Sequence, residues 1–265
     1  MRKAQFNLYK YAEPRAIFEL QSFYLTRALL KRLPKGDGHP VIVFPGFVGS
    51  DISTRPLRKL LQDLGYSSYG WGLGRNLLYN HRRENEMRRL VQKVTRKEGR
   101  KVSLIGWSLG GLFAREVAKA EPDSVRSVMS LGTPITGQSA LTNAGDLFKV
   151  LNGTPKDPST SRFAEFAKSP PVPTSSIYSK TDGIVAWEAS VQKDEPSTEN
   201  IIVPASHLGM GVNPLVMVVI ADRLRQEEGA WKPFDSSGLK GLIYGDPKRP
   251  FSKTLKSIMR GTISA

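Results

Sequence analysis

The chain has 265 residues, of which 39% are hydrophobic and 24% are charged, which is enough for one large globular domain with a sizeable core. It contains no cysteine, so disulfides, thiolate metal sites and a cysteine nucleophile are excluded. The formal net charge of +15 raises the question of anionic partners, either nucleic acid or an anionic membrane surface.

Residues 1–38 are expected to form an N-terminal helical extension that packs on the core. An apolar helix should run from about Pro14 to Leu33, where the breaker residues 34–38 end it. Lying on a membrane and covering a substrate entrance are the alternatives for this helix. The start lacks the apolar segment of a secretory signal, and no run approaches the roughly 18 apolar residues of a membrane span. We therefore expect a cytoplasmic protein.

The pattern of residues 39–226 alternates between short apolar runs and helical periodicity. Buried strands are expected at residues 41–44, 66–71, 102–107, 125–131, 175–179 and 201–203. Helices are expected at about residues 51–64, 82–101, 109–120 and 214–225. Such alternation predicts an α/β fold with a mostly parallel central sheet that helices cover on both faces.

Two segments lack this alternation of predicted strands and helices. Residues 135–172 are rich in Gly, Pro, Ser and Thr, and they follow a central strand, where a small cap or lid insertion would lie. Residues 227–265 read as a basic C-terminal tail. Positive charge also gathers on the helix expected at 82–101, where it indicates a solvated face or, alternatively, an anionic partner. No nucleic-acid-binding motif accompanies it, so we expect no specific nucleic acid.

A G-x-S-x-G pentapeptide, residues 106–110, lies between a predicted buried strand and a predicted helix. In this context Ser108 would stand on a sharp strand-to-helix turn, exposed as a nucleophile. Gly106 and Gly110 would let the strand and the helix approach each other. The following helix would direct its positive end at developing negative charge.

A serine nucleophile needs a base, and the hydrolase chain order places an acid and then a histidine after it. His39 and His81 precede Ser108, so only His207 fits. Asp182 is the predicted acid, because it follows an apolar strand and precedes a glycine turn. Its rivals in the interval are Asp157, Glu188, Asp194 and Glu195, none of which lies directly at a strand end before a glycine turn.

Hydrolysis by an attacking serine also requires an oxyanion hole of backbone N–H groups. Leu109, which follows the nucleophile, should supply one donor. Phe47 should supply the second, because Gly46 lets the loop after the first strand approach the site.

These segments resemble the α/β-hydrolase superfamily, and among its members the smaller bacterial lipases and esterases. The loop at residues 45–47 is similar to their His-Gly-x oxyanion segment, with proline where histidine often stands. The surroundings of Asp182 and His207 are similar to lipase-like members. The resemblance covers roughly residues 40–226. It implies a mostly parallel sheet, a nucleophile at its carboxyl edge, and ester hydrolysis without a metal or an organic cofactor.

Apolar residues near the catalytic loops predict a pocket for a hydrophobic acyl group, lined by Val48, Trp71, Trp107, Ile135 and Leu208. Trp107 could instead pack beneath the turn. The predicted function is a carboxylester hydrolase that acts on small-molecule or polymeric, lipid-like esters through an acyl-enzyme on Ser108. Transfer of the acyl group to an alcohol is one alternative. A non-catalytic module that binds anionic surfaces is another, and weak association of the enzyme with an anionic membrane is a further expectation.

Overall fold

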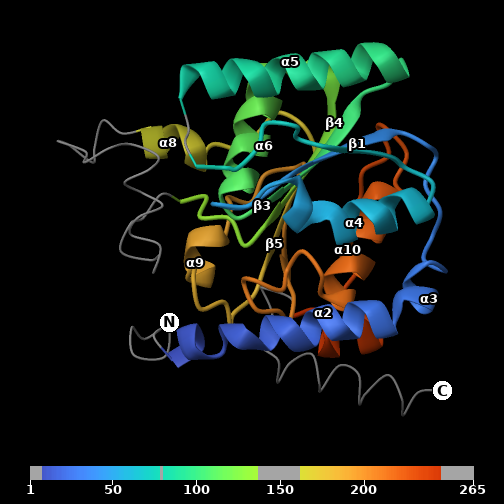
Figure 1. The fold of residues 1–265 in the computed structure, drawn as a ribbon, viewed down its shortest axis with the longest axis vertical. Coiled ribbons are helices and arrows are strands. Elements are labelled where there is room, and N and C mark those ends of the chain that lie inside the picture. Colours follow the sequence, from blue (N-terminus) through green and yellow to red (C-terminus); the bar gives the residue numbers. More distant parts are fainter. Residues whose placement is uncertain (1–7, 78–79, 137–161, 246–265) are drawn as a thin grey trace.

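The computed structural model describes residues 8–77, 80–136 and 162–245, and its centre is a six-stranded sheet in which all neighbouring strands are parallel. The strand order is β2-β1-β3-β4-β5-β6 (Figure 1). The strands are β1 (Pro40–Phe44), β2 (Ser67–Gly70), β3 (Val102–Trp107), β4 (Val125–Leu131), β5 (Thr174–Tyr178) and β6 (Thr198–Ile202). The predicted parallel sheet is confirmed.

Helices cover both faces of this sheet (Figure 1). One face carries α2 (Ala16–Leu25), α3 (Arg27–Leu30), α4 (Asp51–Asp63) and α10 (Pro214–Leu224). The other face carries α5 (His81–Glu98) and α6 (Leu109–Ala120). The shorter elements are α8 (Arg162–Ala167), α9 (Trp187–Ser190) and the 3-10 turns η1 (Glu13–Arg15), η2 (Pro122–Ser124) and η5 (Gly238–Leu242).

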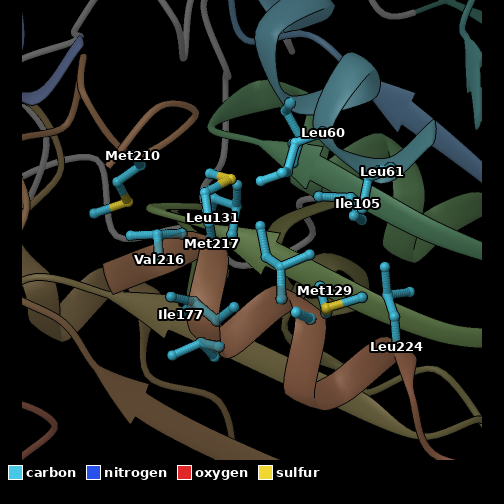
Figure 2. Close-up of a cluster of buried hydrophobic side chains, with 14 of the residues drawn as sticks. Leu60, Leu61, Ile105, Met129, Leu131, Ile177, Met210, Val216, Met217 and Leu224 are labelled. Atoms are coloured by element: carbon cyan, nitrogen blue, oxygen red, sulfur yellow. The ribbon is translucent and has the colours of Figure 1, made fainter. Parts of the chain in front are cut away.

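The core lies in two layers because successive strand residues point to opposite faces of the sheet. In β1, Val41 and Val43 face the layer under α4 and α10, whereas Ile42 and Phe44 face α5 and α6. Figure 2 shows the first layer, in which leucines of α4 and apolar residues of α10 meet across β3, β4 and β5. Strands that are apolar on both faces therefore form the centre of the sheet.

The N-terminal helix differs from the expected single helix over residues 14–33. It is divided at Thr26, whose Oγ1 donates a hydrogen bond to the carbonyl of Ser22 at 2.6 Å, a pattern that bends helices. Only Phe23 and Leu30 of α2 and α3 are buried apolar residues. The other large apolar side chains face outward, with exposed fractions of 69% for Phe18, 84% for Leu25 and 63% for Leu29.

The expected cap at residues 135–172 falls mostly on residues 137–161, which lie outside the described residues; α8 follows them. Of the expected tail, residues 246–265 also lie outside the described part. Within residues 227–245, which are mostly exposed, Phe234 and Tyr244 pack on the core; Tyr244 is buried and its hydroxyl donates to the carbonyl of Leu215 at 3.1 Å. No helix among the described residues has the length and apolar character of a membrane span.

Candidate active site

Ser108 occupies a strained turn between β3 and α6. Its φ of 53° and ψ of −120° lie in a region that non-glycine residues seldom adopt. A Cβ atom on Gly106 would lie 2.3 Å from the carbonyl oxygen of Gly110, and one on Gly110 would lie 2.5 Å from that of Phe44. Both positions therefore require glycine, so the pentapeptide serves the close packing of α6 on the sheet.

Neighbouring backbone holds this turn in place at the carboxyl end of the sheet. The N–H of Ser108 donates to the carbonyl of Leu131 at 2.8 Å, and its carbonyl accepts from Thr133 Oγ1 at 3.0 Å. The side chain of Ser108 makes no capping bond to α6. Its hydroxyl therefore stays available for chemistry at the positive end of that helix.

His207 and Asp182 form a buried pair at the same edge of the sheet. His207 Nδ1 and Asp182 Oδ2 are 2.7 Å apart, and the two residues are 3% and 1% exposed. The second carboxylate oxygen of Asp182 accepts from the N–H groups of Ile184 and Val185 at 2.8 and 2.7 Å. The pair uses Nδ1, so Nε2 is the ring nitrogen that remains for a reacting group.

Charges near His207 change its pKa. Burial by itself lowers the pKa of an imidazole, because it disfavours the charged form. The charge and the hydrogen bond of Asp182, together with the charge of Glu13, outweigh burial and raise the pKa of His207 above its ordinary value. The surroundings therefore stabilise an imidazolium at this position.

The other candidate bases and acids lie elsewhere. His39 is buried in contact with Asp37 and Ser103, where burial lowers its pKa to about 4. The side chain of His81 is 88% exposed at the start of α5. Among the rival carboxylates, Asp194 and Glu195 are exposed, Glu188 lies on α9, and Asp157 is outside the described residues.

The loop after β1 presents the predicted second oxyanion donor. In the described part of the chain, neither the Phe47 N–H nor the Leu109 N–H donates a hydrogen bond to another residue. The next residue, Val48, has a φ of 63°, which is unusual for a β-branched residue. Asn76 holds this conformation, because its carbonyl accepts from Val48 N at 2.8 Å and its Nδ2 donates to the carbonyl of Pro45 at 2.7 Å.

An apolar cavity of about 200 Å³ lies beside Ser108, His207 and Phe47. Phe47, Trp107, Ser108, His207 and Leu208 all line it, and the other described residues that line it are Gly46, Gly49, Ser53 and Ile184. The indole of Trp107 also donates to the carbonyl of His207 at 3.0 Å, so it both supports the histidine and borders the cavity.

The remaining predicted pocket residues are not among those lining the cavity. Val48 is 47% exposed. Trp71 is buried in the layer under α5, where its N–H donates to Asp51 Oδ1 at 2.9 Å. Ile135 is fully buried. Asn76 and Ile184, which the sequence did not single out, lie in or beside the site instead. Within the described residues, no group of three or more His, Asp or Glu side chains is placed to hold a metal ion.

A parallel sheet with this strand-to-helix serine turn defines the α/β-hydrolase superfamily. A family model described as palmitoyl protein thioesterase matches residues 40–197, which is more than half of the chain. The chain belongs to the palmitoyl protein thioesterase family, and it is a hydrolase. The predicted superfamily and fold are confirmed, whereas the narrower resemblance to bacterial members stays a prediction.

Solved structures share this fold at low identity. Aspergillus fumigatus lipase B is 18% identical, with a TM-score of 0.57 over 75% of this chain and 55% of that protein. Bacillus licheniformis lipase BlEst2 in its mature form is 15% identical, with a TM-score of 0.54 over 74% and 95%. Pyrococcus horikoshii acylaminoacyl peptidase is 14% identical, with a TM-score of 0.54 over 77% and 40%. This chain thus spans about half of the Aspergillus lipase.

Proposed function

We propose that this protein is a serine hydrolase that cleaves carboxylic esters or thioesters of apolar acyl groups through an acyl-enzyme on Ser108. One observation carries the proposal: the strained Ser108 and His207, which is paired with the buried Asp182, line one apolar cavity. A strained, uncapped serine beside a buried imidazole–carboxylate pair fits nucleophilic catalysis better than a structural role.

Acylation begins when Ser108 Oγ attacks the carbonyl carbon of the ester and His207 Nε2 takes up the hydroxyl proton. Asp182 keeps Nδ1 protonated and stabilises the imidazolium that forms. The carbonyl oxygen becomes an oxyanion, which the Phe47 and Leu109 N–H groups receive. Collapse of the intermediate breaks the bond to the leaving alcohol or thiol, which departs with the proton from His207.

Deacylation repeats these steps with water as the nucleophile. His207 Nε2 removes a proton from water, and the resulting hydroxide attacks the acyl-enzyme carbonyl. The second intermediate collapses to the carboxylic acid, and Ser108 regains its proton from His207. An alcohol in place of water would give acyl transfer with the same residues, so analysis of the products in the presence of an alcohol distinguishes the two reactions.

The cavity lining supports the choice of an acyl substrate. Phe47, Trp107, Ile184 and Leu208 offer apolar surface beside Ser108, and among the described residues that line the cavity no Asp, Glu, Lys or Arg is found. A volume of about 200 Å³ is smaller than the ~300 Å³ at which pockets for drug-sized ligands begin, so a short acyl group fits it best. The family's description names a palmitoyl thioester, which makes the thioester a second candidate substrate.

Covalent labelling tests the nucleophile. A fluorophosphonate probe should form one adduct, which peptide mapping by mass spectrometry assigns to Ser108. Labelling needs the assembled site, so heat-unfolded protein should remain unlabelled. An adduct on another serine, or none together with no turnover of any ester, would reject the proposal and favour the binding module for anionic surfaces.

The size of the cavity predicts a preference for short acyl chains. Along a series of p-nitrophenyl esters from acetate to palmitate, kcat/KM for butyrate should exceed that for palmitate by about tenfold, the factor that ~1.4 kcal/mol of transition-state stabilisation gives. A parallel series of S-acyl thioesters shows which leaving group the enzyme prefers. A rate that rises steadily to palmitate would contradict the assignment of this cavity as the acyl pocket.

Two further expectations stay predictions. Weak association with an anionic membrane is supported by the net charge of +15 and by the outward apolar side chains of α2 and α3. The cytoplasmic location is the other.

A further inference from the structure

The N-terminal segment contacts both loops that carry the catalytic pair. Glu13 in η1 is 5% exposed, and its carboxylate accepts three backbone hydrogen bonds. Oε1 accepts from the N–H of Gly183 at 2.9 Å and from that of His207 at 3.0 Å, and Oε2 accepts from that of Leu208 at 2.9 Å. One side chain therefore joins the backbone beside Asp182 to the backbone of His207 itself.

Two neighbours of Glu13 add further contacts: Arg15 joins the same two loops, whereas Glu19 binds the His207 loop alone. Arg15 Nη2 donates to the carbonyl of Thr181 at 2.7 Å and to that of Ala205 at 3.0 Å. The carboxylate of Glu19 accepts from the N–H of Ser206 at 2.8 Å and from its hydroxyl at 2.9 Å. Charged groups are strong hydrogen-bond partners, and here they bind the loops after β5 and β6 from one direction.

A glycine in each of the two loops leaves room for the N-terminal segment to pack against it. A Cβ atom on Gly183 would lie 2.4 Å from the backbone of Tyr9, and one on Gly209 would lie 1.4 Å from Glu19 Oε2. Gly183 therefore permits an approach that any side chain would block, and a side chain at position 209 would displace Glu19. Glu13 and Arg15 each bind both loops and so fix their relative position, and Glu19 adds two bonds to the His207 loop.

Glu13 also acts on His207 through its charge. Among the described residues, the charged groups near this imidazole are Asp182 on the β5 loop and Glu13, Arg15 and Glu19 on the N-terminal segment. Burial lowers the pKa of His207, and Asp182 raises it. The charge of Glu13 also raises this pKa. Removing the Glu13 charge should therefore lower the pKa of the base.

We propose that Glu13 is a positioning residue, which holds the Asp182 loop and the His207 loop in the single geometry that the reaction requires. This inference rests on the proposed serine hydrolase function. It makes the N-terminal segment a part of the active site, although the matched family model begins only at residue 40. Productive geometry depends on such supporting hydrogen bonds around the reacting groups.

Glu13→Gln tests the role, because it retains the shape of the side chain and removes its charge. Its amide NH₂ also cannot accept, so at least one of the three N–H groups loses its partner. We expect kcat for p-nitrophenyl butyrate to fall by about 10²-fold with little change in KM, as misplacement of catalytic groups does. The acid limb of the pH–rate profile should move to lower pH, since the neutral base persists further into acid.

Glu227→Gln is the matched control, because Glu227 is an exposed glutamate far along the chain, and it should match the wild type in kcat and in the pH profile. If Glu13→Gln folds and shows the kcat and the pH profile of the wild type, the positioning role is overturned. Turnover and labelling of the wild-type enzyme test the proposed function separately, so the two failures can be distinguished. If Glu13→Gln does not fold, Arg15→Gln decides, because Arg15 joins the same two loops. A several-fold loss of kcat at constant KM supports the role, and a wild-type kcat rejects it.

Discussion

Replacing Ser108 by alanine is expected to lower kcat for ester hydrolysis by about 10⁶-fold. The reaction loses its nucleophile, and the remaining oxyanion donors and binding surface supply only a small residual rate. The fold should survive, because the Ser108 hydroxyl makes no capping bond to α6. Initial rates with p-nitrophenyl butyrate measure the loss of activity, and a thermal unfolding curve tests whether the fold survives. Turnover within tenfold of the wild type would place the nucleophile elsewhere.

The strained backbone at this position provides a second readout on the same residue. Glycine adopts a φ of 53° without steric cost, so Ser108→Gly should relieve about 1 kcal/mol of strain and unfold at a higher temperature than Ser108→Ala. Both variants should be equally inactive. A gain in stability together with a complete loss of activity is typical of a residue that is retained for chemistry.

Replacing Asp182 by asparagine is expected to lower kcat/KM by about 10⁴-fold near neutral pH. The carboxylate now accepts from His207 Nδ1 with one oxygen and from Ile184 N and Val185 N with the other. An amide has one oxygen for these two tasks. If that oxygen stays with the backbone, its NH₂ group faces Nδ1, favours the wrong imidazole tautomer, and leaves Nε2 unable to act as the base.

The Asp182→Asn variant should also differ from the wild type in the pH dependence of its activity. Asp182 helps to raise the pKa of His207, and the base works in its neutral form, so wild-type activity is lost as the pH falls through that raised pKa. The variant lacks the charge, so its residual activity should persist to lower pH. Asp194→Asn is the matched control, because Asp194 lies exposed within the same interval, and its rate should stay within about twofold. Equal losses in both variants would contradict the assignment of the acid.

The elements that the sequence predicted well are local ones. The strand, turn and helix around Ser108 follow from neighbouring residues, since apolar runs and spaced glycines report on contacts a few positions away. The fold class follows in the same way from the alternation of strands and helices, with boundaries within a few residues of those observed. Chain order then proposed His207 and Asp182, and the structure brings these two side chains together.

The features that sequence reasoning missed depend on distant contacts. Glu13 meets His207 across 194 positions, and a glutamate just before the expected apolar helix gives no sign of such a partner. Asn76 supports the Phe47 loop from a glycine-rich stretch, where its amide could equally have faced water. Trp71 and Ile135 were expected in the pocket because they lie near catalytic loops in the chain. Proximity along the chain does not say on which side of a sheet a side chain points.

The strand order has a consequence for how the chain is made. After β1 and β2 pair, each later strand, from β3 to β6, pairs with a strand that was synthesised before it. The sheet can therefore grow in the order of synthesis, with Ser108 in position early. Of the three catalytic side chains His207 is made last, and its loop closes on the segment around Glu13, which was made 194 positions earlier. A nascent chain thus presents its serine long before it has the base to use it.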